Sequence, residues 1–330
     1  MATQVVSAEG RSSRHLLDVA GLAWPALKGL LDEARQAQQQ LDSPAGGSDA
    51  LRGIGVATLF YEPSTRTRIS FEAAATALGA RVTTVDVGTS SVGKGESLVD
   101  TVRTLEALRH QVIVLRHERA GAPWVAARHA TGSIVNAGDG WHAHPTQALL
   151  DLSVLSRHLG DRDGRLAGRR IAIVGDLLHS RVVRSNLHTL TAAGAAVVLA
   201  GPTSLTRGFA EHAAAFAGGP GTVEMAGSLD EALSGADAIM ALRIQRERLT
   251  PGELDSLEAY RDTWGLTEAR LAALAPHALV LHPGPMNEGV EIDPEVADGP
   301  RSLVLEQVRA GVPMRMAVLL RVVGAGRGHG

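Results

Sequence analysis

The sequence predicts an α/β protein with two domains, each built on a parallel β-sheet that is flanked by helices in three α/β/α layers. Short β-rich runs alternate with helical patterns along most of the chain, which is typical of stacked βαβ units. The alternation falls into two successive series, and 330 residues suit two domains of about 150 residues each. We therefore expect one parallel sheet in each half of the chain.

The first series predicts the N-terminal domain. Its strands are expected near residues 54–60, 81–87, 111–115 and 133–136. Its helices are expected near residues 15–40, 64–78, 96–109 and 121–130. Ser64 is a typical N-cap for the second of these helices. Gly79 is placed to end it, because glycine adopts the left-handed conformation that closes many helices.

The second series begins at residue 170 and predicts the other domain. Its strands are expected near residues 170–176, 196–200, 237–242 and 278–281, with a helix near 181–193. A helix from His144 toward His158 connects the two series. The last helix, about 302–322, is expected to pack back across the first domain. The domains would then comprise residues 1–150 with 302–330, and residues 151–301. Residues 1–12 and 324–330 are expected to be disordered.

The composition excludes several classes of protein. A hydrophobic content of 45% and a charged content of 20% are those of a soluble globular protein. The net charge of −3 argues against a general nucleic-acid or acidic-membrane partner. The absence of cysteine excludes disulfides, thiolate metal sites and cysteine nucleophiles. No segment is long and apolar enough for a signal peptide or a membrane span, so we expect a cytoplasmic protein.

An anion site is predicted where the first strand meets its helix, at residues 62–68. The free N–H groups and the dipole of a helix start favour a bound dianion. Arg66 and Arg68 can add bidentate hydrogen bonds to phosphate oxygens. The alternative is a solvated, well-capped helix start. However, two arginines without a carboxylate in the first turn oppose the helix dipole, which favours an anion as their partner.

A nucleotide site is the rival interpretation of the glycine-containing turns. Gly175 and Asp176 follow a predicted strand and precede a predicted helix, as a dinucleotide-binding turn would. The G-x-G-x-x-G pattern and the P-loop pattern with its Lys-Ser/Thr pair are both absent. We therefore expect no nucleotide site, and a structural glycine at position 175.

Several short motifs, taken together, resemble the catalytic chains of the aspartate carbamoyltransferase family. The motifs are residues 63–68, residues 91–97, residues 144–147, Arg243-x-Gln245 and residues 282–287. The first is shared by all carbamoyltransferases. The third discriminates among them, because the ornithine enzymes carry cysteine where this chain has Thr146. The resemblance runs from residues 15–17 to residues 312–319, nearly the whole chain.

The resemblance implies transfer of a carbamoyl group from carbamoyl phosphate to L-aspartate, an early step of pyrimidine (UMP) synthesis, without a cofactor or metal. It assigns Ser64, Thr65, Arg66 and Thr67 to the phosphate, and Arg116 to both phosphate and carbonyl. His144 would donate to the carbonyl oxygen. The remaining carbamoyl phosphate contacts would be Ser91, Gln147, Gly284 and Pro285. The catalytic residues would be Arg66, Thr67, Lys94, Arg116 and His144. Arg68 is expected to be a structural partner instead.

The second substrate, aspartate, carries two carboxylates and needs fixed cations. The resemblance assigns Arg181 to the α-carboxylate and Arg243, helped by Gln245, to the side-chain carboxylate, with Lys94 as a further contact. Arg243 follows a predicted strand, at the carboxyl edge where open α/β sheets bind ligands. The neighbouring Arg246 and Arg248 are expected to be exposed or paired with Glu247.

The resemblance also concerns assembly. In the family, the loop with Ser91 and Lys94 reaches into a neighbouring subunit, which implies a homotrimer with shared active sites. Whether a larger complex forms with regulatory chains or dihydroorotase stays open.

His142 and His144 form a His-x-His pair, but the sequence offers no third ligand with suitable spacing, so no metal site is expected. Glu288 departs from the family, whose bacterial members often carry arginine there.

Two alternatives remain open from the sequence. One is a carbamoyltransferase that acts on another amine, such as ornithine. The other is a non-catalytic homologous subunit of a pyrimidine-pathway complex, although a scaffold would not need this set of polar residues.

Overall fold

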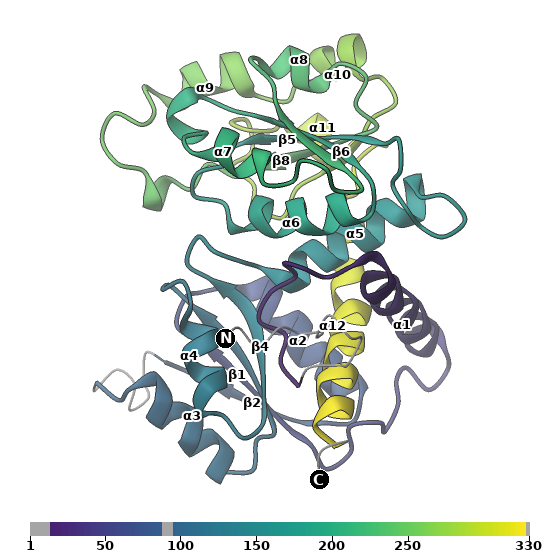
Figure 1. Cartoon of the computed structure of the whole chain (residues 1–330), viewed down its shortest axis with the longest axis vertical. Coiled ribbons are helices and arrows are strands. Elements are labelled where there is room, and N and C mark those ends of the chain that lie inside the picture. Colours follow the sequence, from purple (N-terminus) through teal and green to yellow (C-terminus); the bar gives the residue numbers. More distant parts are fainter. Residues whose placement is uncertain (1–13, 88–94, 328–330) are drawn as a thin grey trace. The chain divides into compact units, whose positions relative to one another are not determined.

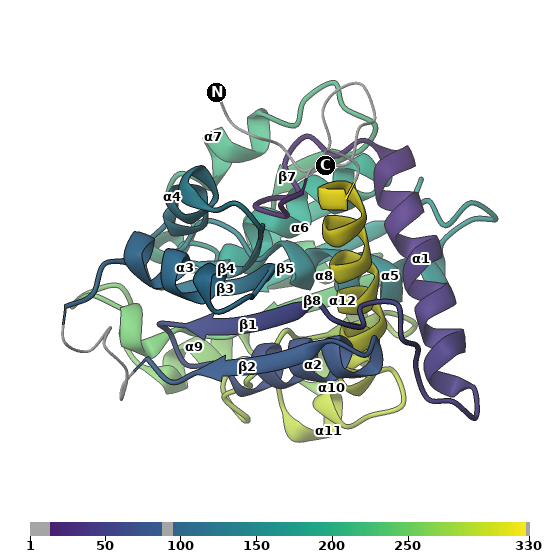
Figure 2. The same cartoon turned by 90° about the horizontal axis from the view of Figure 1, so that it is seen from below.

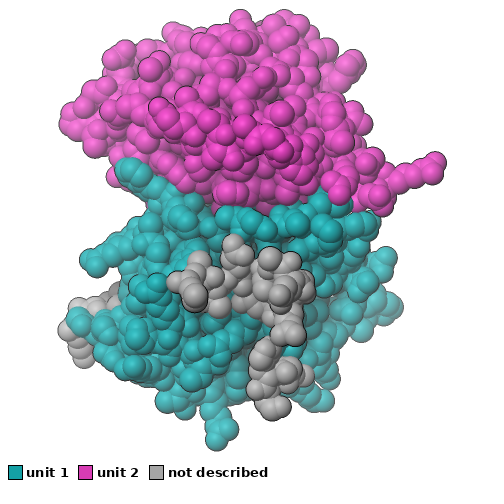
Figure 3. Space-filling view, in the orientation of Figure 1, with its two compact units in different colours: residues 1–150, 308–330 teal, residues 151–307 magenta. Residues whose placement is uncertain are grey.

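A computed structural model describes residues 14–87 and 95–327 and divides into two compact units, coloured separately in Figure 3. Unit 1 comprises residues 1–150 and 308–330, and unit 2 comprises residues 151–307. The chain leaves unit 1 within helix α5 (Pro145–Leu159) and returns to it within helix α12 (Val304–Arg327). Unit 1 is therefore discontinuous in sequence.

Unit 1 is built on a parallel sheet, whose strands in the described residues follow the order β2-β1-β3-β4. The strands are β1 Gly55–Phe60, β2 Arg81–Val85, β3 Val112–His117 and β4 Ser133–Asp139. The other helices of this unit are α1 Trp24–Asp42, α2 Thr65–Ala77, α3 Leu98–Ala107 and α4 Ala122–His129. Helices α3 and α4 lie on one face of the sheet and α2 on the other (Figure 2).

The alternation of side chains along β1 explains this layering. Ala57 and Leu59 point to the face covered by α3 and α4, where they join a buried apolar cluster with Val102 and Ala126. Thr58 points to the opposite face, where its hydroxyl donates to Glu72 of α2 at 3.2 Å. Because successive strand residues face opposite sides, one short apolar strand supports both helix layers.

Unit 2 is built on a second parallel sheet, and its described strands follow the order β7-β6-β5-β8-β9. The strands are β5 Arg170–Gly175, β6 Ala196–Ala200, β7 Thr222–Met225, β8 Ala238–Leu242 and β9 Leu279–Leu281. The helices are α6 Arg181–Ala192, α7 Phe209–Ala214, α8 Leu229–Leu233, α9 Leu257–Trp264, α10 Glu268–Leu274 and α11 Pro294–Ala297, with 3-10 turns at Thr203–Leu205 and Arg246–Arg248. Helices α8 and α10 cover one face of the sheet and α6 covers the other (Figure 1).

The prediction of parallel sheets flanked by helices is confirmed, and the differences have local causes. The first helix begins at Trp24 rather than near residue 15, because the chain before it pairs with the sheet, where Leu16 bridges Val135 and its N–H donates to the Ile134 carbonyl at 3.0 Å. Strand β7 was not predicted, because it is a short edge strand whose residues are half-exposed or exposed and so lack an apolar pattern. Helix α12 continues through Arg327, so residues 324–327 are helical and not disordered as expected. Residues 1–12 and 328–330 lie outside the described residues.

Within residues 14–87 and 95–327, no helix is both long and apolar enough to span a membrane.

The stability of unit 1 is expected to fall in mild acid because of His15. This side chain is buried, and its Nδ1 accepts a hydrogen bond from the Ile134 N–H at 3.0 Å. Burial, and secondly the Arg14 guanidinium, lowers the pKa of His15 from 6.5 to about 4. The unfolded chain then binds the proton more tightly, so the stability is present above about pH 6.5 and is lost as the pH falls toward the folded pKa.

We expect His15 alone to lower the free energy of unfolding by about 1 kcal/mol between about pH 7.5 and about pH 5.5. Urea unfolding of the wild type and of His15→Asn at both pH values measures this, because asparagine keeps an acceptor but does not titrate. An equal pH dependence in the two proteins would contradict the assignment.

Candidate active site

The predicted anion site lies at the carboxyl edge of the unit 1 sheet, where β1 leads into α2. Ser64 occupies the N-cap position in an extended conformation, as predicted, but its side chain makes no cap hydrogen bond. Thr65 and Arg66 are exposed in the first helical turn, and Thr67 is buried. The first-turn N–H groups therefore point to this edge, where the helix dipole favours an anion. Arg68 lies back along the helix, with Nε 4.0 Å from Glu72 Oε1.

Arg116 reaches the same edge from the end of β3, where it pairs in register with Phe60 of β1. The pairing of β3 with β4 is irregular between Leu115 and His117, and such irregularities re-aim side chains. Arg116 is mostly buried, and its Nη2 donates to Glu62 Oε1 at 3.2 Å. Sequence reasoning gave Glu62 no role. Its position as the first residue of the predicted anion site, residues 62–68, was the available signal.

His144 and Gln147 come from the start of α5, after β4. Both are buried, and the Nε2 atom of His144 lies 3.5 Å from Thr67 Oγ1. His144 also caps the helix through its carbonyl, which accepts from the Gln147 N–H at 3.1 Å. The structure thus brings His144, Thr67 and the start of α2 together. Gln147 likewise faces the protein interior rather than solvent.

A buried hydrogen-bond network holds the segment that leads to His144. Asn136 Nδ2 donates to Asp139 Oδ1 at 2.8 Å, and Asp139 Oδ2 accepts from the Gly121 N–H at 2.7 Å. His142 lies against this network, with Nδ1 3.3 Å from Asp139 and Nε2 3.6 Å from Asp18. These contacts give His142 a structural partner within its own loop. Sequence reasoning missed Asn136 and Asp139, because the role of Asp139 depends on Gly121, which folding brings close.

In unit 2, Arg181 is the first residue of α6 and is buried. The preceding loop is organised by Asp176, whose carboxylate accepts from the His179 N–H at 3.1 Å and from the Gln245 N–H at 3.2 Å. Burial raises the pKa of Asp176, although nearby His179 and these hydrogen bonds act in the opposite direction. Asp176 thereby joins the loops after β5 and β8. Its carboxylate therefore has a structural role in these two loops.

Arg243 and Gln245 follow β8 at the carboxyl edge of the unit 2 sheet. Arg243 is partly buried, and its Nη2 pairs with the Glu247 carboxylate. Gln245 Nε2 donates to the His179 carbonyl at 2.8 Å. Arg246 is exposed as expected, but Arg248 is half-buried and also donates to the His179 carbonyl, at 3.1 Å. Exposure, one of the two expected alternatives, therefore holds for Arg246, whereas the Arg248 side chain bonds to the loop after β5.

Gly284 and Pro285 follow β9 at the same edge of the unit 2 sheet. Gly284 has a φ of 63°, which a residue with a side chain rarely adopts, so this turn requires glycine. Its N–H donates to His282 Nδ1 at 2.8 Å, which sets the orientation of the turn. Ser91 and Lys94, the two other predicted site residues, lie outside the described residues.

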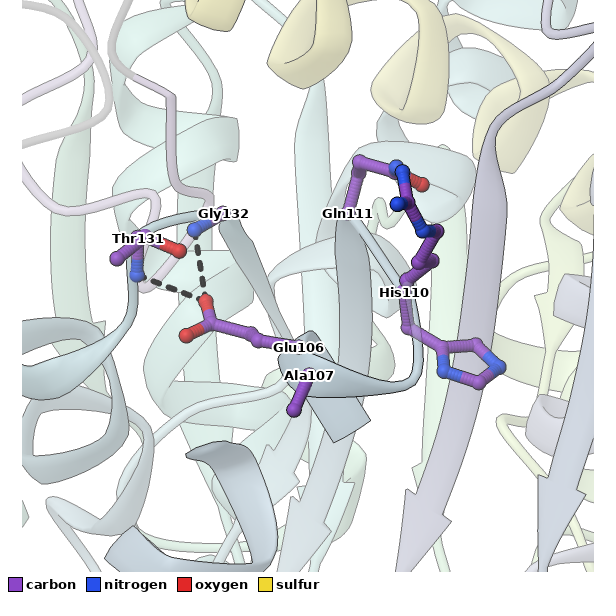
Figure 4. Close-up of a pocket in the computed structure, with 7 residues that line it drawn as sticks. Glu106, Ala107, His110, Gln111, Thr131 and Gly132 are labelled. Carbon is purple, nitrogen blue, oxygen red and sulfur yellow. Dashed lines mark hydrogen bonds between the residues drawn. The ribbon is translucent and has the colours of Figure 1, made fainter. Parts of the chain in front are cut away.

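A surface hollow of about 420 Å³ in unit 1 is separate from these residues. Its wall includes the loops just before β3 and β4, at the amino edge of the sheet. Figure 4 shows Glu106 pointing to the N–H groups of Thr131 and Gly132, each 2.7 Å away. The candidate site residues of unit 1 lie at the opposite, carboxyl edge, so this hollow is not the candidate site.

Both halves of the chain match profiles of known protein domains. Residues 14–157 match the profile of the aspartate/ornithine carbamoyltransferase carbamoyl-P binding domain, and residues 167–322 match that of the Asp/Orn binding domain. The chain belongs to the aspartate/ornithine carbamoyltransferase family. Among known carbamoyltransferases, the aspartate carbamoyltransferase catalytic subunit of Chloroflexus aggregans is 50% identical over 311 residues. That match covers 94% of this chain and 98% of the relative. The subunit of Gluconobacter oxydans is 50% identical over 309 residues, covering 94% and 95%.

Solved carbamoyltransferase structures share the fold along most of the chain. The catalytic subunit of M. jannaschii aspartate transcarbamoylase matches with a TM-score of 0.82 and 34% identity, covering 96% of this chain and 100% of that one. The Trypanosoma cruzi enzyme in complex with N-(phosphonacetyl)-L-aspartic acid matches with a TM-score of 0.83 and 31% identity, covering 96% and 97%.

Proposed function

We propose that this chain is an aspartate carbamoyltransferase that forms N-carbamoyl-L-aspartate and phosphate in pyrimidine synthesis. The observation that carries the proposal is the meeting of Thr67, His144 and the start of α2 at one sheet edge, beside Arg116. This edge of unit 1 offers an anion-binding helix start and two donors for a carbonyl oxygen. Relatives that are 50% identical along nearly their whole length are named as this enzyme.

The reaction follows from these groups. Thr65, Arg66 and the first-turn N–H groups of α2 bind the phosphate of carbamoyl phosphate. His144 and Thr67 polarise the carbonyl oxygen, on which negative charge grows as the neutral amine of aspartate attacks the carbonyl carbon. The carbon–oxygen bond to phosphate then breaks, and the departing phosphate takes the proton that the amine loses. Catalysis rests on orientation and fixed charge, so no cofactor or metal is needed.

Arg181 and Arg243 favour aspartate as the acceptor in this proposal. Two guanidinium groups at one sheet edge suit two carboxylates, whereas the side-chain ammonium of ornithine would be repelled. Assays of the purified chain with carbamoyl phosphate and either amine test this. We expect carbamoyl-aspartate and no citrulline. Turnover of ornithine alone would overturn the choice of acceptor, and no turnover of either would favour the non-catalytic subunit.

We propose further that the enzyme is a cytoplasmic homotrimer whose neighbouring chains share active sites through Lys94. Chains with Lys94→Ala and chains with His144→Ala should each be nearly inactive as homotrimers. Mixed after mild dissociation, they should regain part of the wild-type activity, because some sites then receive an intact Lys94 and an intact His144. Activity assays after verified chain exchange check this expectation. Absence of recovery would argue that each chain completes its own site.

A further inference from the structure

Unit 2 contains a buried carboxylate, Glu291, that has no part in the mechanism described above. Its side chain is 1% exposed. Oε1 accepts a hydrogen bond from the Asn287 N–H at 2.6 Å and lies 3.2 Å from His282 Nε2. Oε2 accepts from Asn287 Nδ2 at 3.2 Å. Burial of a carboxylate is costly unless donors such as these surround it, so its presence needs an explanation.

The contact between Glu291 and His282 controls the Gly284 turn. The Gly284 N–H donates to His282 Nδ1, so in the neutral ring the proton lies on Nε2, which donates to Glu291. Glu291 therefore selects the tautomer that can hold Gly284. The backbone of His282 is held as well, because its N–H donates to Gln307 Oε1 at 2.9 Å.

The contact between Glu291 and the Asn287 side chain controls the segment after β8. Asn287 Nδ2 donates to the Ile244 carbonyl at 3.0 Å as well as to Glu291. Ile244 is buried and lies between Arg243 and Gln245 in the sequence. Glu291 sets the orientation of the Asn287 side-chain amide by accepting a hydrogen bond from its nitrogen. The amide in this orientation fixes the backbone at Ile244, between the two proposed aspartate ligands.

The backbone of Glu291 is anchored to the apolar core of unit 2. Its carbonyl accepts from the Leu266 N–H at 3.1 Å, and Leu266 and Ile292 belong to the apolar core of unit 2. A polar group that is anchored in a core can hold flexible neighbours precisely. The carboxylate thus connects this core to the Gly284–Pro285 turn and to the Arg243–Gln245 segment, each of which has residues assigned to a substrate.

We propose that Glu291 is a positioning residue, which holds the Gly284–Pro285 turn through His282 and the Arg243–Gln245 segment through Asn287. The inference rests on the proposed function, because only aspartate carbamoylation gives these two loops a common task. Glu291 touches no substrate in this proposal. It keeps the ligands of aspartate and of the carbamoyl group at a constant spacing.

Glu291→Gln tests the proposal with almost no change of shape. Glutamine offers one acceptor oxygen, and its NH₂ group would face the donors on Asn287 or His282. We expect the KM for aspartate to rise about tenfold or more and kcat to fall, while the Kd for inorganic phosphate, bound by α2 in unit 1, stays within about twofold. The matched control is Glu295→Gln, four residues on and exposed, which should match the wild type.

Asn287→Ala keeps the test decisive if the first variant does not fold. It retains the backbone contact to Glu291 and the His282 pair, and it removes both side-chain hydrogen bonds of Asn287, to the Ile244 carbonyl and to Glu291 Oε2. We expect the KM for aspartate to rise about fivefold, because the Arg243–Gln245 segment loses its hydrogen bond to Asn287. Thermal unfolding of each variant accompanies the kinetics. An unchanged KM for aspartate, with or without a lower melting temperature, would overturn the positioning role.

The same measurements separate failure of this inference from failure of the proposed function. A wild-type chain that forms no carbamoyl-aspartate overturns the function. An active wild type, with variants whose KM for aspartate is unchanged, overturns the inference alone.

Discussion

Arg66→Ala is expected to lower kcat/KM for carbamoyl phosphate by about 10³-fold and to abolish measurable phosphate binding. Arg66 is exposed in the first turn of α2, where its guanidinium can form bidentate, charge-assisted hydrogen bonds with a phosphate. Removing one such fixed donor from a catalytic site typically costs about 3–4 kcal/mol of transition-state stabilisation. Steady-state kinetics and calorimetric titration with phosphate measure the two effects.

Arg68→Ala is the matched control for this experiment. Arg68 lies in the same helical turn and carries the same charge, but its guanidinium is directed toward Glu72. We expect its removal to change kcat/KM by less than about threefold, the magnitude of a surface ion pair. Near-normal activity of Arg66→Ala, or equal losses in the two variants, would refute the specific phosphate role of Arg66.

Arg243→Ala is expected to raise the KM for aspartate by about 10²-fold or more, with unchanged phosphate binding. The arginine follows β8 at the carboxyl edge of the unit 2 sheet, where its guanidinium pairs with the Glu247 carboxylate. Loss of two charge-assisted hydrogen bonds to a substrate carboxylate accounts for this magnitude. Kinetics at saturating carbamoyl phosphate, with varied aspartate, provide the measurement.

Arg246→Ala serves as the control, because Arg246 lies three residues on and is exposed. Its KM for aspartate should equal that of the wild type. If Arg243→Ala weakened phosphate binding as strongly as aspartate binding, the defect would be general, and the assignment of Arg243 to aspartate would be wrong.

Most of the fold could be predicted from local patterns. The runs that became β1, β3 and β5 are apolar, β-branched and bounded by turn signals, so they read as strands without any tertiary information. Strand β7 has no such pattern, because an edge strand needs little burial and is recognised only by its pairing with β6. Likewise, the sheet contact of Leu16 explains why the chain before Trp24 is not helical.

The candidate site residues likewise divide into those that local sequence patterns predict and those that depend on tertiary contacts. Arg66, His144 and Arg243 could be predicted because each stands in a short motif at the end of a predicted strand or the start of a predicted helix. Glu62 and Glu291 could not be assigned, since their roles come from partners that folding brings close. Arg116 is distant in sequence from Glu62, and the tautomer of His282 depends on two contacts at once.

The sequence by itself determined the alternation of strands and helices, the anion-binding helix start after β1 and the family resemblance. These are local properties, set by backbone preferences, side-chain periodicity and the spacing of a few polar residues. Only the tertiary structure decided which polar side chains share a hydrogen bond. It placed Arg116 beside Glu62, His144 beside Thr67 and Asn287 beside the Ile244 carbonyl. The physical reason is that a hydrogen bond depends on distance and direction in space, and parallel sheets bring together loops that are far apart in the chain.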